Sequence, residues 1–296
     1  MPRTTPPRPV DVEALFAELG PLRRSATRLH PRRGTPTVRD SSVGGPMLWP
    51  AGEPWPVCTT AHKRAGGYRH LPDTDPVPLL AVAQLYRRDV PGLPFPEQGD
   101  VLQVFWCGFE RHGESRHEPY VELRWRWAAD VTKAAPGQQP VPEVVGREEL
   151  VPSACVLHPE VVTEHPWFEE LDPGLQERIE CWEEGIEEEE EDGDGEIYVT
   201  DLSTAPGWKV GGYIAWNLTG PADPRCADCG AGLVPLLTAA ATEWDPGTTS
   251  WIPDEDRPDR VVRGANTPTG VSPGRGRLIV AVCPRDPDHP HRLISQ

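Results

Sequence analysis

Two cysteine motifs in the last third of the chain constrain its fold more than any other feature. Cys226 and Cys229 form a C-x-x-C turn followed by Gly230, and Cys283 precedes His289 by six positions. Each motif adjoins a short apolar run, so we expect a tight turn to supply two ligands and a strand end to supply two more. Three thiolates and one imidazole suit tetrahedral zinc, and the glycine eases the turn. The sequence therefore predicts a Cys3His zinc site.

This predicted site has four protein ligands, which leave no open position for a catalytic water. A structural role is therefore favoured over a catalytic one. His291 is a rival to His289 as the fourth ligand. A redox C-x-x-C pair would need a helix N-terminus to lower its thiol pKa, and the surrounding glycine and prolines favour no helix there. No nucleophile elbow, HExxH motif or carboxylate pair stands out, so we name no catalytic residue.

The first half of the chain repeats the same order of features in weaker form. The matched segments are residues 43–49 with 210–216, 78–89 with 235–245, and 99–107 with 276–283. A cysteine and a histidine also recur in register with the C-terminal motifs, which makes five matches in one order and indicates an internal duplication. The residues at the ligand positions of the first copy predict a second, Cys2His2 site: Cys58, His62, Cys107 and His112, with His117 as a rival to His112.

Short apolar runs bounded by proline or glycine are typical of strands, and 37 prolines argue against an all-helical chain. We expect an α+β fold, mainly β, in which two β-rich repeats pack about a pseudo-twofold axis around an inserted helical and acidic segment. The expected divisions are an N-terminal arm and helix (1–40), a first repeat (41–133), a linker with helices and an acidic loop (134–205), and a second repeat (206–296). The two repeats would form one compact domain.

Within these divisions the pattern predicts individual elements. Expected strands cover residues 79–86, 101–107, 120–127 and 197–202. Expected helices cover 10–19 and, with breaks at two prolines, 159–184. Residues 1–9 are expected to be disordered, 23–39 extended, and 134–146 a linker.

Two glycine pairs and two glutamines stand out within these elements. Gly44-Gly45 and Gly211-Gly212 predict positions where the backbone turns or approaches another segment closely; a phosphate-binding loop is less favoured, because no G-x-G-x-x-G pattern follows. Gln84 and Gln103 interrupt apolar runs. Either they satisfy backbone groups or they contact a ligand.

The formal net charge of −17 is unevenly distributed. Residues 183–196 contain ten acidic residues and no basic one, whereas the first 40 residues contain eight arginines. The acidic run is either a solvated, disordered loop or an anionic surface for a basic partner. Direct binding of nucleic acid is disfavoured, because phosphate contacts need a concentrated basic face.

The chain also carries features that bear on its compartment. No apolar run approaches 18 residues, which predicts no transmembrane helix, and the first residues lack the apolar core of a signal peptide. Seven cysteines without a secretion signal fit a reducing cytoplasm. We therefore expect a cytoplasmic protein.

Seven short motifs occur in one order along residues 40–290. They are Gly44-Gly45, Trp55-Pro56, Leu80 to Gln84, Gly99 to Phe105, Val210 to Tyr213, Cys226 to Gly230, and Gly276 to Pro284. This order resembles the YwqG-like family, a bacterial family of unknown function. The resemblance implies a soluble, duplicated, β-rich domain and carries no catalytic residues. Residues 242–245 depart from the Q-x-D pattern expected in the second copy.

Three functional hypotheses follow. The first is a zinc-stabilised module that binds a protein partner with a basic face; the resemblance to the YwqG-like family implies that an immunity-type protein that neutralises a toxin is one form of it. The second is a small-molecule-binding or enzymatic domain with its cleft between the repeats. The third is a structural scaffold without a ligand.

Overall fold

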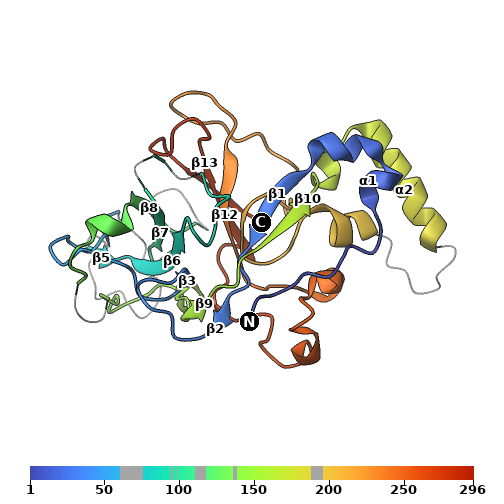
Figure 1. The fold of residues 1–296 in the computed structure, drawn as a ribbon. Coiled ribbons are helices and arrows are strands. Elements are labelled where there is room, and N and C mark those ends of the chain that lie inside the picture. Colours follow the sequence, from blue (N-terminus) through green and yellow to red (C-terminus); the bar gives the residue numbers. More distant parts are fainter. Residues whose placement is uncertain (61–75, 95, 98, 111–117, 136–138, 188–195) are drawn as a thin grey trace.

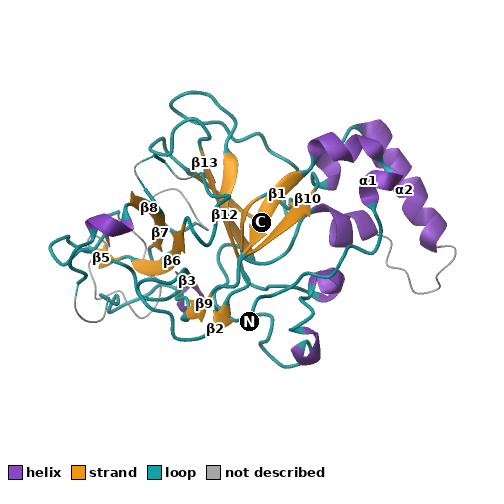
Figure 2. Ribbon diagram, viewed as in Figure 1, coloured by secondary structure: helices purple, strands orange, loops and turns teal. Residues whose placement is uncertain are grey.

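The computed structural model describes residues 1–296 except 61–75, 95, 98, 111–117, 136–138 and 188–195 (Figure 1). Within the described residues the fold is mainly β, with fourteen strands in three antiparallel sheets and few helices, as the sequence predicts. In Figure 2 the strands occupy the middle and one end of the molecule, and the longest helices gather at the other end.

The first six-stranded sheet contains β12, which follows the C-x-x-C motif, and β13, which leads into Cys283. Its strands are, in spatial order, β10 (Glu160–Glu164), β1 (Arg24–Arg28), β11 (Lys209–Gly211), β12 (Val234–Ala240), β13 (Arg277–Val282) and β14 (Arg292–Ser295). The second six-stranded sheet contains β2 (Arg32–Arg33), β9 (Cys155–Val156), β3 (Ser42–Val43), β6 (Leu80–Tyr86), β7 (Val101–Trp106) and β8 (Val121–Arg126). The two-stranded sheet pairs β4 (Val57–Cys58) with β5 (Val77–Pro78).

The two large sheets share one apolar core. It includes Val82 and Val104 from the second sheet and Leu237 and Val280 from the first. Strands β6 and β7 are buried along almost their whole length, because a second apolar cluster that includes Phe105 covers their other face. Burial on both faces explains why these strands read as continuous apolar runs and not as alternating patterns.

The helical elements are short except for one. They are α1 (Val12–Leu15), η1 (Ala17–Leu22), η3 (Ala128–Asp130), η4 (Glu148–Leu150), η5 (Phe168–Glu170), α2 (Pro173–Glu187), the π-helical turn η6 (Tyr198–Ser203), η7 (Pro246–Trp251) and η8 (Arg257–Asp259). Of the predicted helix over 10–19, Val12, Phe16 and Leu19 are buried as expected, but Leu15 is exposed because the chain changes to a 3-10 helix after it.

Three local predictions are wrong. Residues 160–164 form a strand and not a helix, because β-branched side chains pair antiparallel with β1. Residues 197–202 are mostly π-helical and not a strand, because Tyr198 and Leu202, four positions apart, both pack against the helices α1 and α2. Residues 1–9, expected to be disordered, instead make hydrogen bonds to distant segments; the hydroxyl of Thr5, for example, donates to Glu160.

Candidate metal centre

The C-x-x-C motif forms a tight turn just before β12. The backbone N–H of Cys226 donates to Ala231, and that of Gly230 donates back to Cys226, at 2.8 and 3.0 Å. Gly230 has φ +69°, a left-handed conformation that costs glycine little. This turn brings both thiols of the motif to one side of the chain.

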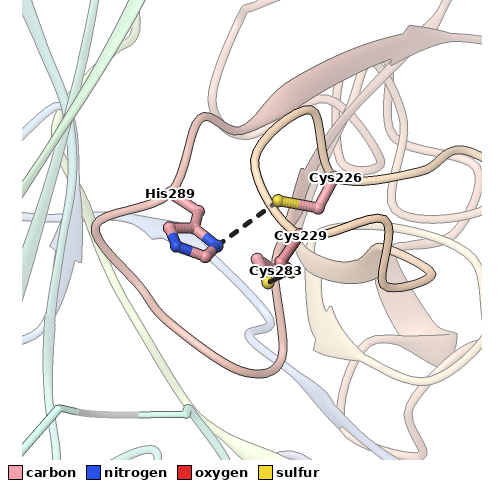
Figure 3. A group of neighbouring side chains, drawn as sticks. All are labelled: Cys226, Cys229, Cys283 and His289. Carbon is pink, nitrogen blue, oxygen red and sulfur yellow. Dashed lines mark hydrogen bonds between the residues drawn. The ribbon is translucent and has the colours of Figure 1, made fainter.

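The other two side chains come from the far end of β13. Cys283 directly follows that strand, and His289 lies in the loop that leads to β14. Figure 3 shows the imidazole of His289 directed toward the sulfur of Cys226, with the sulfurs of Cys229 and Cys283 adjacent. The structure thus brings together the four predicted residues of the first site.

The spacing of the four donor atoms fits a tetrahedral metal ion. Cys226 Sγ lies 3.4 Å from His289 Nδ1, Cys229 Sγ lies 3.5 Å from Cys283 Sγ, and all four atoms lie within 4.8 Å of one another. Zn–S and Zn–N bonds of about 2.3 and 2.0 Å place tetrahedral donor atoms about 3.5–3.8 Å apart. Residues with this donor set and spacing can hold a metal ion without rearrangement of the backbone.

The environment of the cluster favours a thiolate at Cys283. Desolvation raises the pKa of this thiol, but backbone N–H groups of Arg285 and Asp286, with His289 and Cys229, outweigh it and lower the pKa to about 6. The pKa of His289 is raised, chiefly by its hydrogen bond to Cys283. The pKa of Cys229 is raised: the Ala231 N–H lowers it, but desolvation and the neighbouring thiols outweigh this.

The carboxylate of Asp286 lies near the outer ring nitrogen of His289. Asp286 Oδ2 lies 3.6 Å from His289 Nε2, the ring nitrogen that faces away from the thiols. Carboxylates that accept a hydrogen bond from this nitrogen orient metal-bound imidazoles and fix their tautomer, and Asp286 lies just beyond hydrogen-bond distance of it. The rival His291 is not in the cluster; it faces the backbone of Val121 instead.

The second predicted site is only half described. Cys58 and Cys107 are both completely buried and belong to one apolar cluster with Phe105 and Phe109. His62 and His112 lie outside the described residues, as does the rival His117. The Cys2His2 site therefore stays a prediction.

A cavity of about 540 Å³ adjoins the candidate metal-ligand cluster of Cys226, Cys229, Cys283 and His289. Tyr120, Glu122 and Trp125, in and just before β8, line one part of it, and His289 and His291 line another. The cavity therefore lies between segments of the two predicted repeats, and one candidate metal ligand forms part of its wall.

The two glutamines are occupied by protein groups. Gln84 Oε1 accepts from the backbone of Leu48 at 2.7 Å and from Gln103 Nε2 at 2.8 Å. Gln103 Oε1 accepts from Arg126 at 2.9 Å. Of the two interpretations, the structure favours satisfaction of backbone and side-chain partners.

The glycine pairs have the expected conformations. Gly44, Gly211 and Gly212 have φ between +61° and +73°. A Cβ atom on Gly212 would lie 2.1 Å from a carboxylate oxygen of Glu164, and one on Gly44 would lie 2.6 Å from the carbonyl oxygen of Ser153. Close approach of other segments thus accounts for both pairs.

Sequence reasoning missed buried charged residues on and beside the first three strands of the first large sheet. Lys209 Nζ lies 2.6 Å from Glu164 Oε1, and both side chains are almost fully buried. His30, the one described residue other than glycine with positive φ, contacts Glu160 at 3.0 Å. Lys209 and Glu164 lie on strands that are far apart in the sequence, and His30 lies in the segment between β1 and β2, so only the folded sheet brings the members of each pair together.

Comparisons of the sequence with protein-family models and with curated proteins found no match in either set. Among the described residues, no helix combines the length and apolar character needed to cross a bilayer.

Proposed function

We propose that this protein is a zinc-stabilised protein-interaction module whose partner presents a basic surface. Neutralisation of a toxin by an immunity-type protein is one form of that role. The observation that carries the proposal is the closed cluster of three cysteines and one histidine, which has the donor set of structural zinc. Such an ion would hold the turn before β12 to the loop after β13, two segments with little secondary structure of their own.

The proposed partner-binding surface includes the acidic face of helix α2. This helix buries Leu175 and Ile179 and exposes Glu177, Glu180 and Glu184. In Figure 1 the helix lies at the opposite end of the molecule from β6, β7 and β8. Exposed charges of one sign accelerate the encounter with an oppositely charged partner, and salt screens this effect.

The test is affinity capture from the native host with the intact, metal-loaded protein, followed by association kinetics with the captured partner. We expect Glu177→Gln/Glu180→Gln/Glu184→Gln to slow association at low salt and to have little effect at about 1 M salt, where the Debye length is about 3 Å. The matched control is Glu97→Gln/Asp130→Asn/Glu143→Gln, which removes three exposed charges from the first half of the chain. Equal slowing by both triple variants, or by neither, would contradict the proposed surface.

A second candidate function is the binding of a small molecule. It is favoured by the cavity of about 540 Å³ between the segments 118–125 and 287–293, a volume within the usual range for ligand sites. Under this alternative the metal ion would fix one wall of the cavity through His289. A thermal-shift screen of small molecules, run on the wild type and on Glu122→Gln, tests this alternative. A compound that raises the Tm of the wild type but not that of Glu122→Gln, a substitution in the cavity wall, would favour ligand binding over partner binding by α2.

We further infer that the two large sheets arose by an internal duplication about a pseudo-twofold axis, as the sequence matches suggest. Three strands follow in the same order in each sheet: β6, β7 and β8 after β3, and β12, β13 and β14 after β11. The ladders β6–β7 and β12–β13 are each irregular at the third residue of their first strand, at Val82 and at Leu236.

The tripeptide Leu-His-Pro supports this inference and extends it. Residues 29–31 separate β1 from β2, and residues 157–159 separate β9 from β10. In both places the chain passes from one large sheet to the other, in opposite directions. The proposed repeats would then begin near residues 24 and 155. The first strand of each repeat, β1 or β9, would lie in the sheet that is built mainly from the other repeat. An experimental structure tests this: superposing the halves should place Cys58 on Cys226 and Cys107 on Cys283.

A further inference from the structure

A second cavity, of about 280 Å³, lies away from the metal-ligand cluster. Its wall combines the π-helical turn η6, the segments on both sides of β11, the start of η7 and the first residue of β13. Irregular π-helical turns are frequent at functional sites. The volume is just below the usual range for drug-sized ligands, so the cavity suits a small one.

Three hydrogen-bond donors in this wall lack partners. The Nη1 atom of Arg277 and the Nε1 atom of Trp167 are buried and have no hydrogen bond within the described part of the chain. Thr204 also lines the cavity, and its hydroxyl has no hydrogen bond to another described residue, although its oxygen is not one of the fully buried atoms. Buried donors without partners carry a large desolvation cost, so a group that accepts from them would be bound strongly.

Arg277 is the charged donor among the three. No carboxylate of the described residues lies within ion-pair distance of its guanidinium. Asp245, which also lines the cavity, already accepts from the backbone of Gly247 and Thr248 at 3.0 Å each and from the Thr248 hydroxyl. Burial lowers the pKa of Arg277, and Asp245 offsets only part of this effect. Arg277 is half-buried, with its Nη1 atom fully buried, and a guanidinium of this kind without an ion pair is an attachment point for an anion.

The rest of the wall restricts which anion fits. Asp245 and the exposed Glu196 place two acidic groups around one arginine, which disfavours a dianion such as phosphate. Val199, Ala205 and Ala215 supply an apolar lining beside the donors. A single negative charge joined to a compact apolar body matches this combination.

We propose that this cavity binds a small monocarboxylate. The carboxylate accepts hydrogen bonds from Arg277, with Trp167 Nε1 and the Thr204 hydroxyl as further donors, and the apolar body of the ligand packs against Val199 and Ala215. The proposal depends neither on the metal ion nor on the partner surface of α2. It assigns a role to the arginine that opens β13, which no sequence motif marked.

Benzoate is the probe for the test, with isobutyrate as a second, aliphatic acid. Small ligands of this size reach dissociation constants of about 10 mM or tighter when they fit well. We expect saturation-transfer NMR to detect at least one of the two acids on the full-length, metal-loaded protein. The same acid should raise Tm, because it binds the folded state. Its neutral amide, benzamide or isobutyramide, and inorganic phosphate should each bind at least ten-fold more weakly.

Arg277→Gln should weaken binding of the acid at least ten-fold. The matched control is Arg275→Gln, which removes the same charge two residues away at an exposed position and should leave binding unchanged. Trp167→Phe keeps an aromatic ring, removes the N–H donor and should weaken binding less. Because Arg277→Gln removes a half-buried charge that has no ion pair among the described residues, we expect its Tm without ligand to equal or exceed that of the wild type, which shows that the variant folds.

Several results would overturn the proposal. The proposal fails if neither acid binds at about 10 mM, or if an acid and its amide bind with equal affinity. It also fails if the protein prefers phosphate, or if Arg275→Gln weakens binding of the acid as much as Arg277→Gln does. If Arg277→Gln unfolds, Trp167→Phe and Arg277→Lys still decide the question, because unchanged affinity in both would also contradict the assigned donors.

Discussion

The buried carboxylate of Glu164 shows how a single residue organises the region where strands β1, β10 and β11 meet. Its Oε1 accepts from Lys209 Nζ and from the backbone of Ala205, and its Oε2 accepts from the backbone of Tyr213, at 2.6–2.8 Å. Each of these partners lies at least 41 positions after Glu164 in the sequence. A charge buried in this way is tolerated only while all of its partners remain in place.

Lys209→Met should therefore destabilise the protein strongly. Removal of one partner from a buried ion pair costs about 3–5 kcal/mol, because the other charge stays buried without compensation. Urea unfolding measures the loss, and Lys209→Met/Glu164→Gln should recover part of it. The control is Arg178→Gln, which breaks the exposed pair with Glu18 and should not change stability measurably. A Lys209→Met variant as stable as the wild type would show that the pair contributes nothing.

His30 predicts a pH dependence of stability. Burial lowers its pKa from 6.5 to about 4; the hydrogen bond to Glu160 opposes this effect, and Arg28 and Arg32 reinforce it. Between these two pKa values the unfolded chain binds a proton that the folded protein does not, so stability falls as the pH falls. Linkage gives a loss of about 2 kcal/mol between about pH 7.5 and about pH 5.

His30→Asn should remove most of that loss, because asparagine tolerates positive φ and does not titrate. The measurement is the free energy of unfolding in urea at both pH values, for variant and wild type. The metal-ligand cluster contributes to both proteins alike, and Glu160, whose pKa falls to about 2, titrates below this window. An identical pH dependence in the two proteins would refute the assignment.

At the scale of elements, the turn that presents Cys226 and Cys229 depends on one glycine. Gly230 has φ +69°, and a Cβ atom there would meet no other atom within 4 Å. Gly230→Ala should therefore cost only the backbone strain, about 1–2 kcal/mol. Gly220→Ala is the control, because that position is equally open and lacks positive φ. Equal effects of the two substitutions on the free energy of unfolding would show that the turn is not strained by a side chain.

Elements whose side chains bury apolar surface could be predicted from the sequence. Strands β6, β7 and β8 lie within one residue of the expected bounds, and the four residues of the first candidate metal site come together as their spacing predicts. Strand β10 could not be predicted, because two of its three inward side chains, Glu160 and Glu164, are charged. Glu160 is acceptable inside only because it faces Arg28 across the ladder and contacts His30. Neither partner is visible from the local pattern of one strand.

At the scale of the whole molecule, two features hold the two large sheets together. They share one apolar core, and the segments β1–β2 and β9–β10 pass from one sheet to the other. The N-terminal arm joins two strands of the first sheet, because Thr5 contacts both Arg28 of β1 and Glu160 of β10. Neither sheet is complete without strands from both halves of the chain.

Thermal unfolding of the intact protein should therefore be a single cooperative transition. Differential scanning calorimetry should give equal van't Hoff and calorimetric enthalpies. Cys226→Ser should lower the midpoint of that one transition, since a structural metal ion couples to the folding of the whole unit. Two separate transitions, with only the second sensitive to the substitution, would instead indicate halves that fold independently.

The central claim is that Cys226, Cys229, Cys283 and His289 hold a structural zinc ion. Elemental analysis of untagged protein, purified with its thiols reduced, tests it most directly. We predict about one tightly held zinc per chain, its loss in Cys226→Ser and its retention in Cys181→Ser, which replaces an exposed cysteine outside the cluster. A content near two would support the site at Cys58 and Cys107 as well. Protein that folds normally and contains no zinc would contradict the claim.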